Sequence, residues 1–301
     1  MSTRTPGMDH ALYPFSAMPD RPALHWPGGA RLAVTVFLYL EHWELLPPDD
    51  AVRDPRFRDA HGAFTPDYRS YTWREYGNRV GIFRLLDALD DSGLKVTVAA
   101  NTGACTAYPE LVERLVARGY EFAGHGDHAT RMLSGRMDEA EEQAAIAAAL
   151  DTVARTTGRR PTGWISQDYG ESTRTPGLLA DAGLDYVVDW PNDDQPYPMT
   201  VGRPFVSIPS QAEWDDVQLL WHRRVLAPRF PGIIGDALDR LSGEAGGSGR
   251  FFGLHLHPWL AGMPHRFPHM AAAIARVAAT PACWPATAGE VARHMLAKPP
   301  A

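Results

Sequence analysis

Residues 33–40 read Ala-Val-Thr-Val-Phe-Leu-Tyr-Leu and are followed directly by Glu41 and His42. A run that is almost continuously apolar and rich in β-branched residues is typical of a strand buried on both faces of a parallel sheet. Ionisable side chains at the end of such a strand lie where barrel enzymes keep their chemistry. The stretch therefore predicts a central parallel strand and the first residues of a pocket.

Two later apolar runs end in the same way. A Glu-Phe-Ala-Gly run ends at His125, which is followed closely by His128, and a Phe-Phe-Gly-Leu run ends at His255 and His257. The carboxyl ends of parallel strands meet at one end of a barrel. Three runs with this pattern in one chain therefore predict a shared pocket.

The rest of the chain alternates between strand-like and helix-like patterns. The expected strands are residues 31–40, 95–100, 121–124, 163–166, 186–189, 206–208 and 251–255, and the expected helices are 73–92, 108–118, 138–157, 174–182, 233–241, 269–279 and 288–296. Such alternation is typical of βαβ units and a parallel sheet, and about seven strands favour an α/β barrel over an open sheet. No glycine-rich phosphate fingerprint follows the first strand, which argues against a dinucleotide-binding fold.

Composition narrows the class of protein. The chain has 301 residues, of which 45% are hydrophobic and 22% charged, as in globular proteins with a sizeable core. Its net charge of -7 and the lack of a Lys/Arg run predict no nucleic-acid or membrane partner. Cys105 and Cys283 show no metal-binding spacing, which fits a reducing compartment. The first 30 residues show no signal peptide, so we expect a cytoplasmic protein.

We expect residues 1–29 to form an N-terminal arm and residues 30–297 to form one catalytic domain. Residues 43–71 read as a long loop rich in Pro, Asp and Arg. A loop of this length is usually functional, and its composition leaves open whether it is a lid or a subunit contact.

Glu41 is the first candidate for a catalytic group. Beside a buried strand its pKa would be raised unless it is paired, and it could act as a general base. The alternative is a structural ion pair with Arg79 or Arg84. His257 is the stronger candidate for a general acid or base, whereas His255 fits either the pocket or the core.

The three-residue spacing of His125 and His128 allows both to bind one metal ion. A third ligand would come from His42, Glu41 or Asp127, and pocket residues without a metal remain the alternative. No Gly-x-Ser-x-Gly elbow is present, which disfavours covalent serine catalysis.

Two further strand ends carry aromatic and acidic side chains. Asp189 and Trp190 follow one strand, and Trp164 lies in another as a candidate pocket wall. A polar segment follows them, formed by Asp193, Asp194 and Gln195. Two interpretations fit it: a contact with a polar substrate, or an Asx-rich turn.

The ordered motifs resemble the polysaccharide deacetylase superfamily, in its allantoinase-like and cyclic-imide-hydrolase-like branch, over roughly residues 25–296. The segments that carry the resemblance are Trp26-Pro-Gly-Gly-Ala-Arg31, the strand that ends at Glu41-His42-Trp43, Tyr76-Gly-Asn-Arg79-Val-Gly, Gly119-Tyr-Glu-Phe-Ala-Gly-His125-Gly, Gly163-Trp164, Asp189-Trp190 with Asp193-Asp194-Gln195-Pro196, and Leu256-His257-Pro258.

This resemblance implies a distorted, incomplete (β/α) barrel that hydrolyses a C–N bond. In the family an Asp-Asp pair follows the first strand, and here Glu41 and His42 replace it. The family's second motif spaces its two metal histidines by three intervening residues, whereas only two separate His125 from His128. The resemblance implies a divalent metal such as zinc as the candidate cofactor, no organic cofactor, and a homo-oligomer.

The leading hypothesis is a hydrolase of a small cyclic amide, imide or ureide. Glu41 would activate water, His257 would protonate the leaving nitrogen, and Asp189 would orient His257. His125 and His128, with His42, would hold an ion or polarise the carbonyl. Substrate contacts would come from Trp164, Trp190, Asp193, Asp194, Gln195 and Arg79. The alternatives are a metal-dependent N-deacetylase of sugars and a non-catalytic binding protein.

Overall fold

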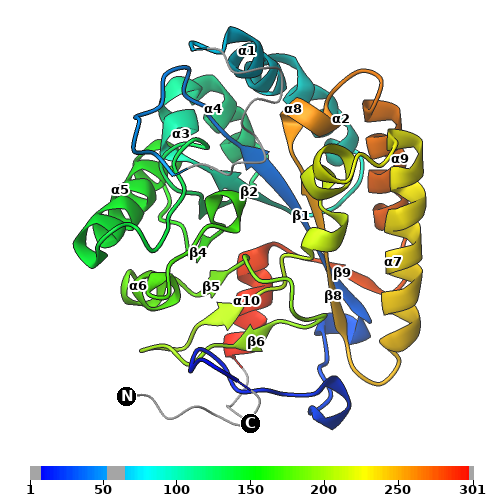
Figure 1. Cartoon of the computed structure of the whole chain (residues 1–301). Helices are drawn as coiled ribbons and strands as arrows, with labels where there is room; N and C mark the ends of the chain where they lie inside the picture. The colour runs from blue at the N-terminus through cyan, green and yellow to red at the C-terminus, as the bar shows by residue number, and fades with distance from the viewer. Residues whose placement is uncertain (1–7, 53–64, 298–301) are drawn as a thin grey trace.

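The computed structural model describes residues 8–52 and 65–297, in which a curled, mostly parallel sheet is surrounded by helices (Figure 1). The strands are β1 (Leu32–Leu40), β2 (Val96–Ala100), β3 (Glu121–Gly124), β4 (Gly163–Trp164), β5 (Tyr186–Val187), β6 (Tyr197–Pro198), β7 (Val206–Ser207), β8 (Arg250–Leu256) and β9 (Cys283–Pro285). They are ordered β6-β7-β5-β4-β3-β2-β1-β8, with β9 beside β1. In this described sheet β6 is antiparallel to β7 and the other pairs are parallel.

The strand predicted from residues 33–40 is the centre of the sheet. The first half of β1 pairs with β8 on one side and β9 on the other, and its second half pairs with β8 and β2. All nine of its residues are buried. The seven parallel strands from β7 to β8 confirm the predicted α/β architecture.

Alternation along β1 sorts its side chains between two cores. Ala33, Phe37 and Tyr39 belong to a cluster inside the curl of the sheet. Leu38 and Leu40 belong to the cluster between the sheet and the outer helices. Because successive strand residues point to opposite faces, the next residue, Glu41, continues the inner series.

The curl does not close into a complete barrel: β8 is the last strand on one side and β6 on the other. The Gln211 side chain spans part of this opening, since Nε2 donates to Phe251 O at 2.7 Å and Oε1 accepts from Gly253 N at 2.5 Å. Asp194 O accepts from Phe251 N at 2.9 Å. The predicted incomplete barrel is therefore confirmed, and a side chain takes the place of a strand at its seam.

The helices mostly follow the predicted ranges. They are α1 (Tyr68–Tyr76), α2 (Ile82–Asp90), α3 (Thr102–Ala107), α4 (Pro109–Ala117), α5 (Glu139–Thr157), α6 (Thr175–Asp181), α7 (Phe230–Glu244), α8 (Pro258–Ala261), α9 (Phe267–Ala278) and α10 (Ala288–Leu296). Helix α5 begins at Asp138, which forms a capping box with Glu141, and ends at Gly158 with φ of 75°. Short turns and α8 interrupt the loops that the sequence predicted.

The helix predicted over residues 73–92 is instead α1 and α2 joined by a π-helical segment, η4 (Gly77–Gly81). This segment lies against the backbone of α8. A Cβ atom at Gly77 would be 2.4 Å from Trp259 N, and one at Gly81 would be 2.3 Å from Pro258 O. Only glycine permits this approach, which brings α1 over the carboxyl end of β1.

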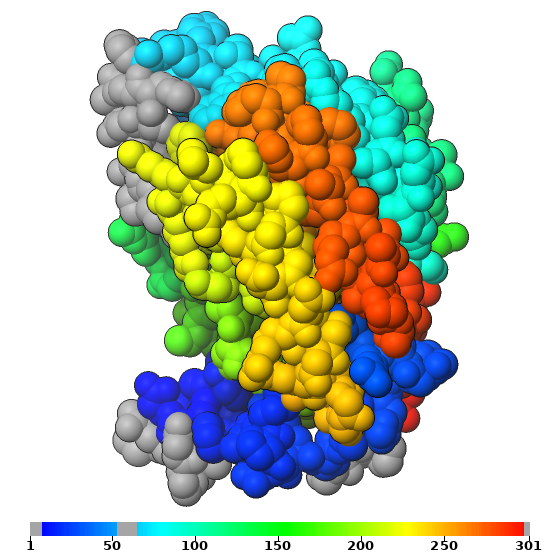
Figure 2. All heavy atoms as spheres, turned by 90° about the vertical axis from the view of Figure 1, so that its right-hand side faces the viewer, coloured from blue at the N-terminus to red at the C-terminus, as the bar shows by residue number. Residues whose placement is uncertain are grey.

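The described part of the N-terminal arm, residues 8–29, runs along the opposite end of the sheet. Trp26 Nε1 donates to Arg250 O, and Arg21 forms an ion pair with Asp193 at 2.7 Å. Figure 2 shows these blue residues at the lower edge of the molecule, below α7 and α9, which pack side by side. None of the helices in the described ranges has the length and apolar character that crossing a membrane requires.

Candidate active site

Glu41 lies directly after β1, and its side chain is almost completely buried. Its Oε1 accepts a hydrogen bond from Gln167 Nε2 at 2.9 Å and lies 3.3 Å from His125 Nε2. Burial opposes ionisation, but the hydrogen bond with His125 and the charge of His257 outweigh it and lower the Glu41 pKa to about 2. Glu41 is therefore paired and ionised, and its pKa is lowered and not raised.

His125 follows β3 and is 1% exposed. Its Nδ1 lies 2.6 Å from Ile165 O, and because a carbonyl oxygen only accepts, Nδ1 carries a hydrogen. Its Nε2 faces the Glu41 carboxylate, which also only accepts. The ring of His125 is therefore held between the Ile165 carbonyl group and the Glu41 carboxylate.

Gln167, which donates to Glu41, belongs to the turn η5 (Gln167–Tyr169). The next two residues, Asp168 and Tyr169, have φ of 49° and 57°, in the left-handed region that non-glycine residues rarely adopt. Such strain persists only where the surroundings fix it, and it concentrates at functional sites. Here it directs Gln167 to Glu41 and Tyr169 to Asp215.

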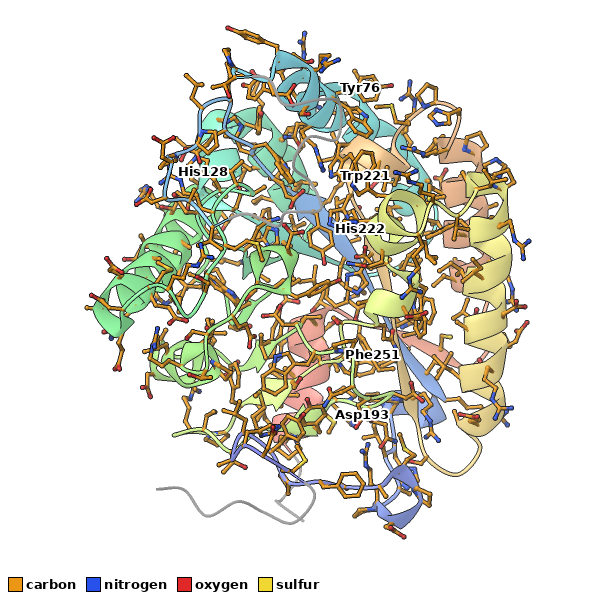
Figure 3. All side chains as sticks on the ribbon, in the orientation of Figure 1. Tyr76, His128, Asp193, Trp221, His222 and Phe251 are labelled. Atoms are coloured by element: carbon orange, nitrogen blue, oxygen red, sulfur yellow. The ribbon has the colours of Figure 1, made fainter. Side chains whose placement is uncertain are left out.

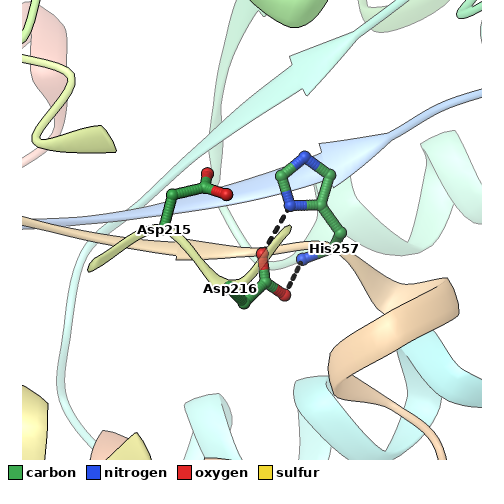
Figure 4. Close-up of side chains that lie close together, drawn as sticks. All are labelled: Asp215, Asp216 and His257. Carbon is green, nitrogen blue, oxygen red and sulfur yellow. Dashed lines mark hydrogen bonds and ion pairs between the residues drawn. The ribbon is translucent and has the colours of Figure 1, made fainter. Parts of the chain in front are cut away.

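His257 follows β8 and is held by Asp216. Its Nδ1 and backbone N both contact this carboxylate, at 2.6 and 2.8 Å, as Figure 4 shows. Burial favours the neutral imidazole, but the ion pair with Asp216 and the charges of Asp215 and Glu41 raise the His257 pKa to about 9. His257 is therefore protonated at neutral pH.

The ring of Tyr39 joins the two halves of the site. It stacks on His257, with ring centroids 3.8 Å apart, and meets His125 edge-on at 5.4 Å. Its hydroxyl group lies 2.9 Å from His255 Nδ1. Burial and the charge of His257 lower the His255 pKa to about 3, so His255 is a neutral histidine of the inner core.

A narrow pocket beside Glu41 has no room for a water molecule in this structure. Its lining is Glu41, Trp43, Tyr71, Arg74, Glu75, Asn78 and Tyr108. Asn78 Nδ2 donates to Glu41 O at 2.7 Å, which ties η4 to the end of β1. The lining therefore brings Glu41 together with aromatic side chains and the buried cation Arg74.

The expected metal set of His42, His125 and His128 is not brought together. His42 has the opposite strand parity to Glu41, so it points to the outer face, where Nδ1 lies 2.9 Å from Tyr108 Oη. His128 lies near His42, with ring centroids 5.7 Å apart. His125 is occupied by Glu41 and Ile165. These residues do not fit a three-ligand metal site.

Within the described ranges, one other group brings metal-ligand atoms within 4.8 Å of one another: Asp215, Asp216 and His257. Both oxygens of Asp216 already accept from His257. Asp215 Oδ1 accepts from Val217 N and Gln218 N. Asp215, Asp216 and His257 are therefore the described residues whose ligand atoms could converge on a metal ion, and in this structure they form a hydrogen-bonded network.

The expectation that Asp189 orients His257 is wrong, since Asp216 does so. Asp189 Oδ1 accepts from Ser166 N at 2.7 Å. Burial raises the pKa of Asp189, and burial together with the charge of Asp189 raises the Glu171 pKa to about 10. A neutral Glu171 carboxyl group is therefore paired with Asp189.

Neither predicted tryptophan wall lines the described pocket. Trp164 is fully buried in the outer core, where its indole packs on Gly124, because its strand parity points it away from the inner face. Trp190 Nε1 donates to Glu171 Oε2 at 3.0 Å, and its ring packs against Tyr13 of the arm.

The polar residues Asp193, Asp194 and Gln195 lie at the start of β8. Asp193 binds Arg21, and Gln195 Nε2 donates to Gly249 O. Phe251 pairs with Ala33, seven residues before Leu40, so at ~3.3 Å per residue these groups are on the order of 20 Å from Glu41. Figure 3 shows Asp193 far below His128. They therefore lie outside the pocket beside Glu41.

Arg79 is also outside the pocket. Its side chain is 71% exposed and pairs with Glu75 at 3.6 Å. The buried cation of the pocket is Arg74, which the sequence argument missed together with Asp216, Gln167 and Asn78. Because successive strand residues point to opposite faces, counting from the inner residue Tyr39 would have placed Glu41 and His42 on different faces. No sequence pattern marks Asp216 or Arg74.

Comparisons with known proteins agree with this geometry. The polysaccharide deacetylase family model matches residues 75–187. A search of curated protein sequences gave no match.

Solved structures match over nearly the whole chain. The crystal structure of PuuE allantoinase is 25% identical, with a TM-score of 0.82 over 94% of this chain and 97% of that one. A protein from Pseudomonas aeruginosa PAO1, described as a probable polysaccharide deacetylase, is 25% identical with a TM-score of 0.80 over the same shares. A polysaccharide deacetylase-like protein from Mycobacterium smegmatis shares the fold, with 23% identity and a TM-score of 0.76 over 94% of each chain.

The matched segment contains η4, His125 and the short strands β4 and β5, while the structural matches extend the likeness to β1 and β8. These findings agree with the motif order read from the sequence. The chain is thus similar to the polysaccharide deacetylase family over residues 75–187, and over nearly its whole length it is similar in structure to PuuE allantoinase.

Proposed function

We propose that the protein hydrolyses a C–N bond in a small cyclic amide, imide or ureide. The observation that carries the proposal is the pairing of an ionised Glu41 with a protonated His257 across the ring of Tyr39. Amide hydrolysis needs a group that takes a proton from water and one that gives a proton to nitrogen. The match of residues 75–187 to the polysaccharide deacetylase family supports the amidohydrolase type of reaction, and the likeness to PuuE allantoinase supports the cyclic substrate.

In the proposed reaction Glu41 takes a proton from water while the water oxygen adds to the carbonyl carbon. The C–N bond then breaks, and His257 Nε2 gives its proton to the leaving nitrogen. Asp216 acts as a positioning residue, because it fixes Nδ1 and so leaves Nε2 as the nitrogen that gives the proton.

A carboxylate with a pKa of about 2 is a weak base. We infer that the bound carbonyl oxygen draws the Nε2 hydrogen of His125 away from Glu41. That movement polarises the carbonyl and raises the basicity of Glu41 in the same step. No step runs through a metal ion, because the histidines expected to bind one do not converge.

The family match favours one second candidate, the N-deacetylation of an acetylated sugar. The same acid and base would serve it, because an acetamide also contains a C–N bond. A third hypothesis, a non-catalytic binding protein, predicts ligand binding without turnover.

A substrate panel tests these proposals. Purified protein is incubated with hydantoin, succinimide, allantoin and N-acetylglucosamine oligomers, and ring opening or acetate release is followed by mass spectrometry, with the Glu41→Gln variant as the blank. Turnover of a cyclic compound supports the leading proposal, and acetate release alone supports the second. Loss of all turnover in the wild type would contradict both.

The family resemblance also leads us to propose a cytosolic homo-oligomer that acts on a small-molecule substrate. Size-exclusion chromatography with light scattering measures the assembly, and a monomeric mass would contradict this part of the proposal.

A further inference from the structure

Two buried carboxylates converge on one nitrogen of the proposed acid. Asp215 and Asp216 are 2% and 0% exposed, and Figure 4 shows both carboxyl groups beside the imidazole ring of His257. We propose that these three side chains bind one divalent transition-metal ion, such as zinc, which takes the place of the hydrogen on His257 Nδ1. The ion site stands apart from the proposed reaction, whereas its inhibitory effect rests on that reaction.

The spacing of the donor atoms suits an ion. One ligand atom from each residue lies within 4.8 Å of the other two. Zinc binds nitrogen and oxygen ligands at about 2.0–2.2 Å, which sets neighbouring ligand atoms of a tetrahedral site about 3.4 Å apart. The distance of 2.6 Å between His257 Nδ1 and Asp216 Oδ1 now holds a hydrogen. Small side-chain movements would therefore close the three ligands around an ion.

Each carboxylate uses one oxygen on the backbone and presents the other to this space. Asp215 Oδ1 accepts from Val217 N and Gln218 N, at 2.8 and 3.0 Å. Asp216 Oδ2 accepts from His257 N at 2.8 Å. Hydrogen bonds of this kind orient the carboxylates of metal sites. Asp215 Oδ2 and Asp216 Oδ1 are thus already fixed as single-oxygen ligands.

The second carboxylate has no charged partner of its own in the part of the chain that the structure describes. The imidazolium of His257 pairs with Asp216. Asp215 Oδ2 lies 3.8 Å from Nδ1 of the neutral His255 and accepts a long hydrogen bond of 3.3 Å from Tyr169 Oη. A buried charge is costly unless a counter-charge or a metal ion compensates it. The orientation of Asp215 therefore favours a further positive charge at this point.

The donor set indicates which ions fit. It contains one imidazole nitrogen and two carboxylate oxygens. Imidazole suits zinc and its neighbours among the transition metals, whereas magnesium prefers oxygen ligands and keeps several waters. The buried surroundings leave little room for such a hydration shell, and His257, at 9% exposed, is the residue of the three that solvent reaches. Zinc is therefore the probe of choice.

Binding of the ion would change the chemistry of His257. The Nδ1–H bond breaks, its proton passes to solvent, and the electron pair left on Nδ1 binds the ion. The ring then loses the positive charge of the imidazolium and keeps a hydrogen on Nε2. A neutral imidazole gives up a proton far less readily than an imidazolium. The bound ion should therefore inhibit the proposed hydrolysis.

Zinc binding is measured first, without any substrate. Protein stripped with a chelator is dialysed against zinc at increasing concentrations, and the bound metal is determined by mass spectrometry. The wild type should bind one ion per chain. In Asp215→Asn the amide oxygen can still accept from Val217 N, while the group facing the site becomes an NH2. Loss of an outer-shell partner alone weakens metal binding about 10- to 100-fold, so loss of this ligand should weaken zinc binding at least as much.

His128→Asn is the matched control, because His128 lies beside His42 on the other face of the sheet. It should bind zinc as the wild type does. Absence of zinc binding in the wild type would overturn the site. Unchanged binding in Asp215→Asn, or binding that only His128→Asn abolishes, would overturn it as well.

X-ray absorption at the zinc edge tests the site without a substitution and decides the matter where Asp215→Asn does not fold. With one equivalent of zinc, the spectrum should contain the scattering of a single imidazole ligand. Two imidazole ligands would place the ion at His42 and His128 and would contradict the proposal.

Inhibition is then measured on the substrate found in the panel. Added zinc should lower kcat of the wild type, EDTA should restore it, and Asp215→Asn should need at least about 10-fold more zinc for the same effect. Unchanged turnover in protein that has bound zinc would overturn the inhibitory role. Absence of wild-type turnover on every substrate would contradict the proposed function instead, and zinc binding would still decide the metal site.

Discussion

Charge state separates the roles of the two central side chains. Glu41 is held ionised by His125 and Gln167, and His257 is held protonated by Asp216. Neither state follows from the residue types alone, because an isolated buried carboxyl or imidazole group would be neutral. The partners therefore set the chemistry, and their removal is the sharpest test of it.

Replacement of Glu41 by Gln keeps the shape of the side chain and removes its negative charge. Loss of a general base commonly reduces the rate by about 10²–10⁴ fold, and we expect a fall of this size in kcat on the substrate found in the panel. Glu110→Gln, an exposed change on α4, is the matched control. Near-normal turnover in a folded Glu41→Gln variant would contradict the assignment.

The His257–Asp216 pair predicts the alkaline limb of the pH profile. The raised pKa of about 9 means that the protonated acid is lost above that pH, so kcat/KM should fall there. Asp216→Asn removes the charge that favours the imidazolium and should move the limb towards the ordinary value of 6.5. The pH dependence of kcat/KM for both proteins measures the shift, and an unmoved limb would contradict the role of Asp216.

The same pair links pH to folding. Because the folded-state pKa of His257 is raised from 6.5 to about 9, its stabilising contribution is complete below about pH 6.5 and is lost as the pH rises through 9. Glu41 acts at the other end, since its lowered pKa gives a contribution that is lost as the pH falls from 4.5 towards 2.

At the scale of elements, the close contact of η4 with α8 positions two pocket residues, one on α1 and one in η4. Arg74 reaches Trp259, and Asn78 reaches the carbonyl of Glu41. The glycines of η4 make this contact possible, since any side chain there would meet backbone atoms.

Gly81→Ala should therefore destabilise the fold. Its new Cβ atom would lie 2.3 Å from Pro258 O, and overpacking of this kind costs about 1–3 kcal/mol. Gly243→Ala, within α7 and with open space around its Cβ position, is the control, and it should stabilise by about 0.5–1 kcal/mol. Thermal unfolding measures both, and equal melting temperatures would contradict the close packing.

Periodicity accounts for what the sequence could predict. Apolar runs marked β1, β2, β3 and β8 because their burial on both faces leaves a plain composition signal. Strand parity, which follows from the same runs, explains why Glu41, His125 and His257 meet on the inner face while His42 and Trp164 do not.

The remaining site residues depend on irregular backbone. Asp216 stands before the π-helical segment η7 (Val217–His222), far from any strand end, and Gln167 depends on two left-handed residues. After Asp189 the chain crosses to the start of β8, which carries Asp193 away from the pocket. No local pattern encodes such paths, because tertiary contacts determine them.

At the scale of the whole molecule, the histidines expected to bind a metal are separated between the two faces of the sheet. We therefore predict that turnover survives dialysis against a chelator such as EDTA and does not rise when zinc is added. Activity and metal content are measured on the same sample. Loss of activity that zinc restores would contradict this prediction and would point to a rearranged His42 and His128.

The Gln211 side chain at the seam of the barrel affects more than the fold. An uncovered strand edge exposes a row of backbone donors and acceptors on which another chain can pair. By occupying Phe251 O and Gly253 N, Gln211 removes two of these positions on β8, and Asp194 removes a third. The open side of the barrel is thereby protected against edge-to-edge association, so that the molecule keeps an incomplete sheet without the aggregation hazard that usually accompanies one.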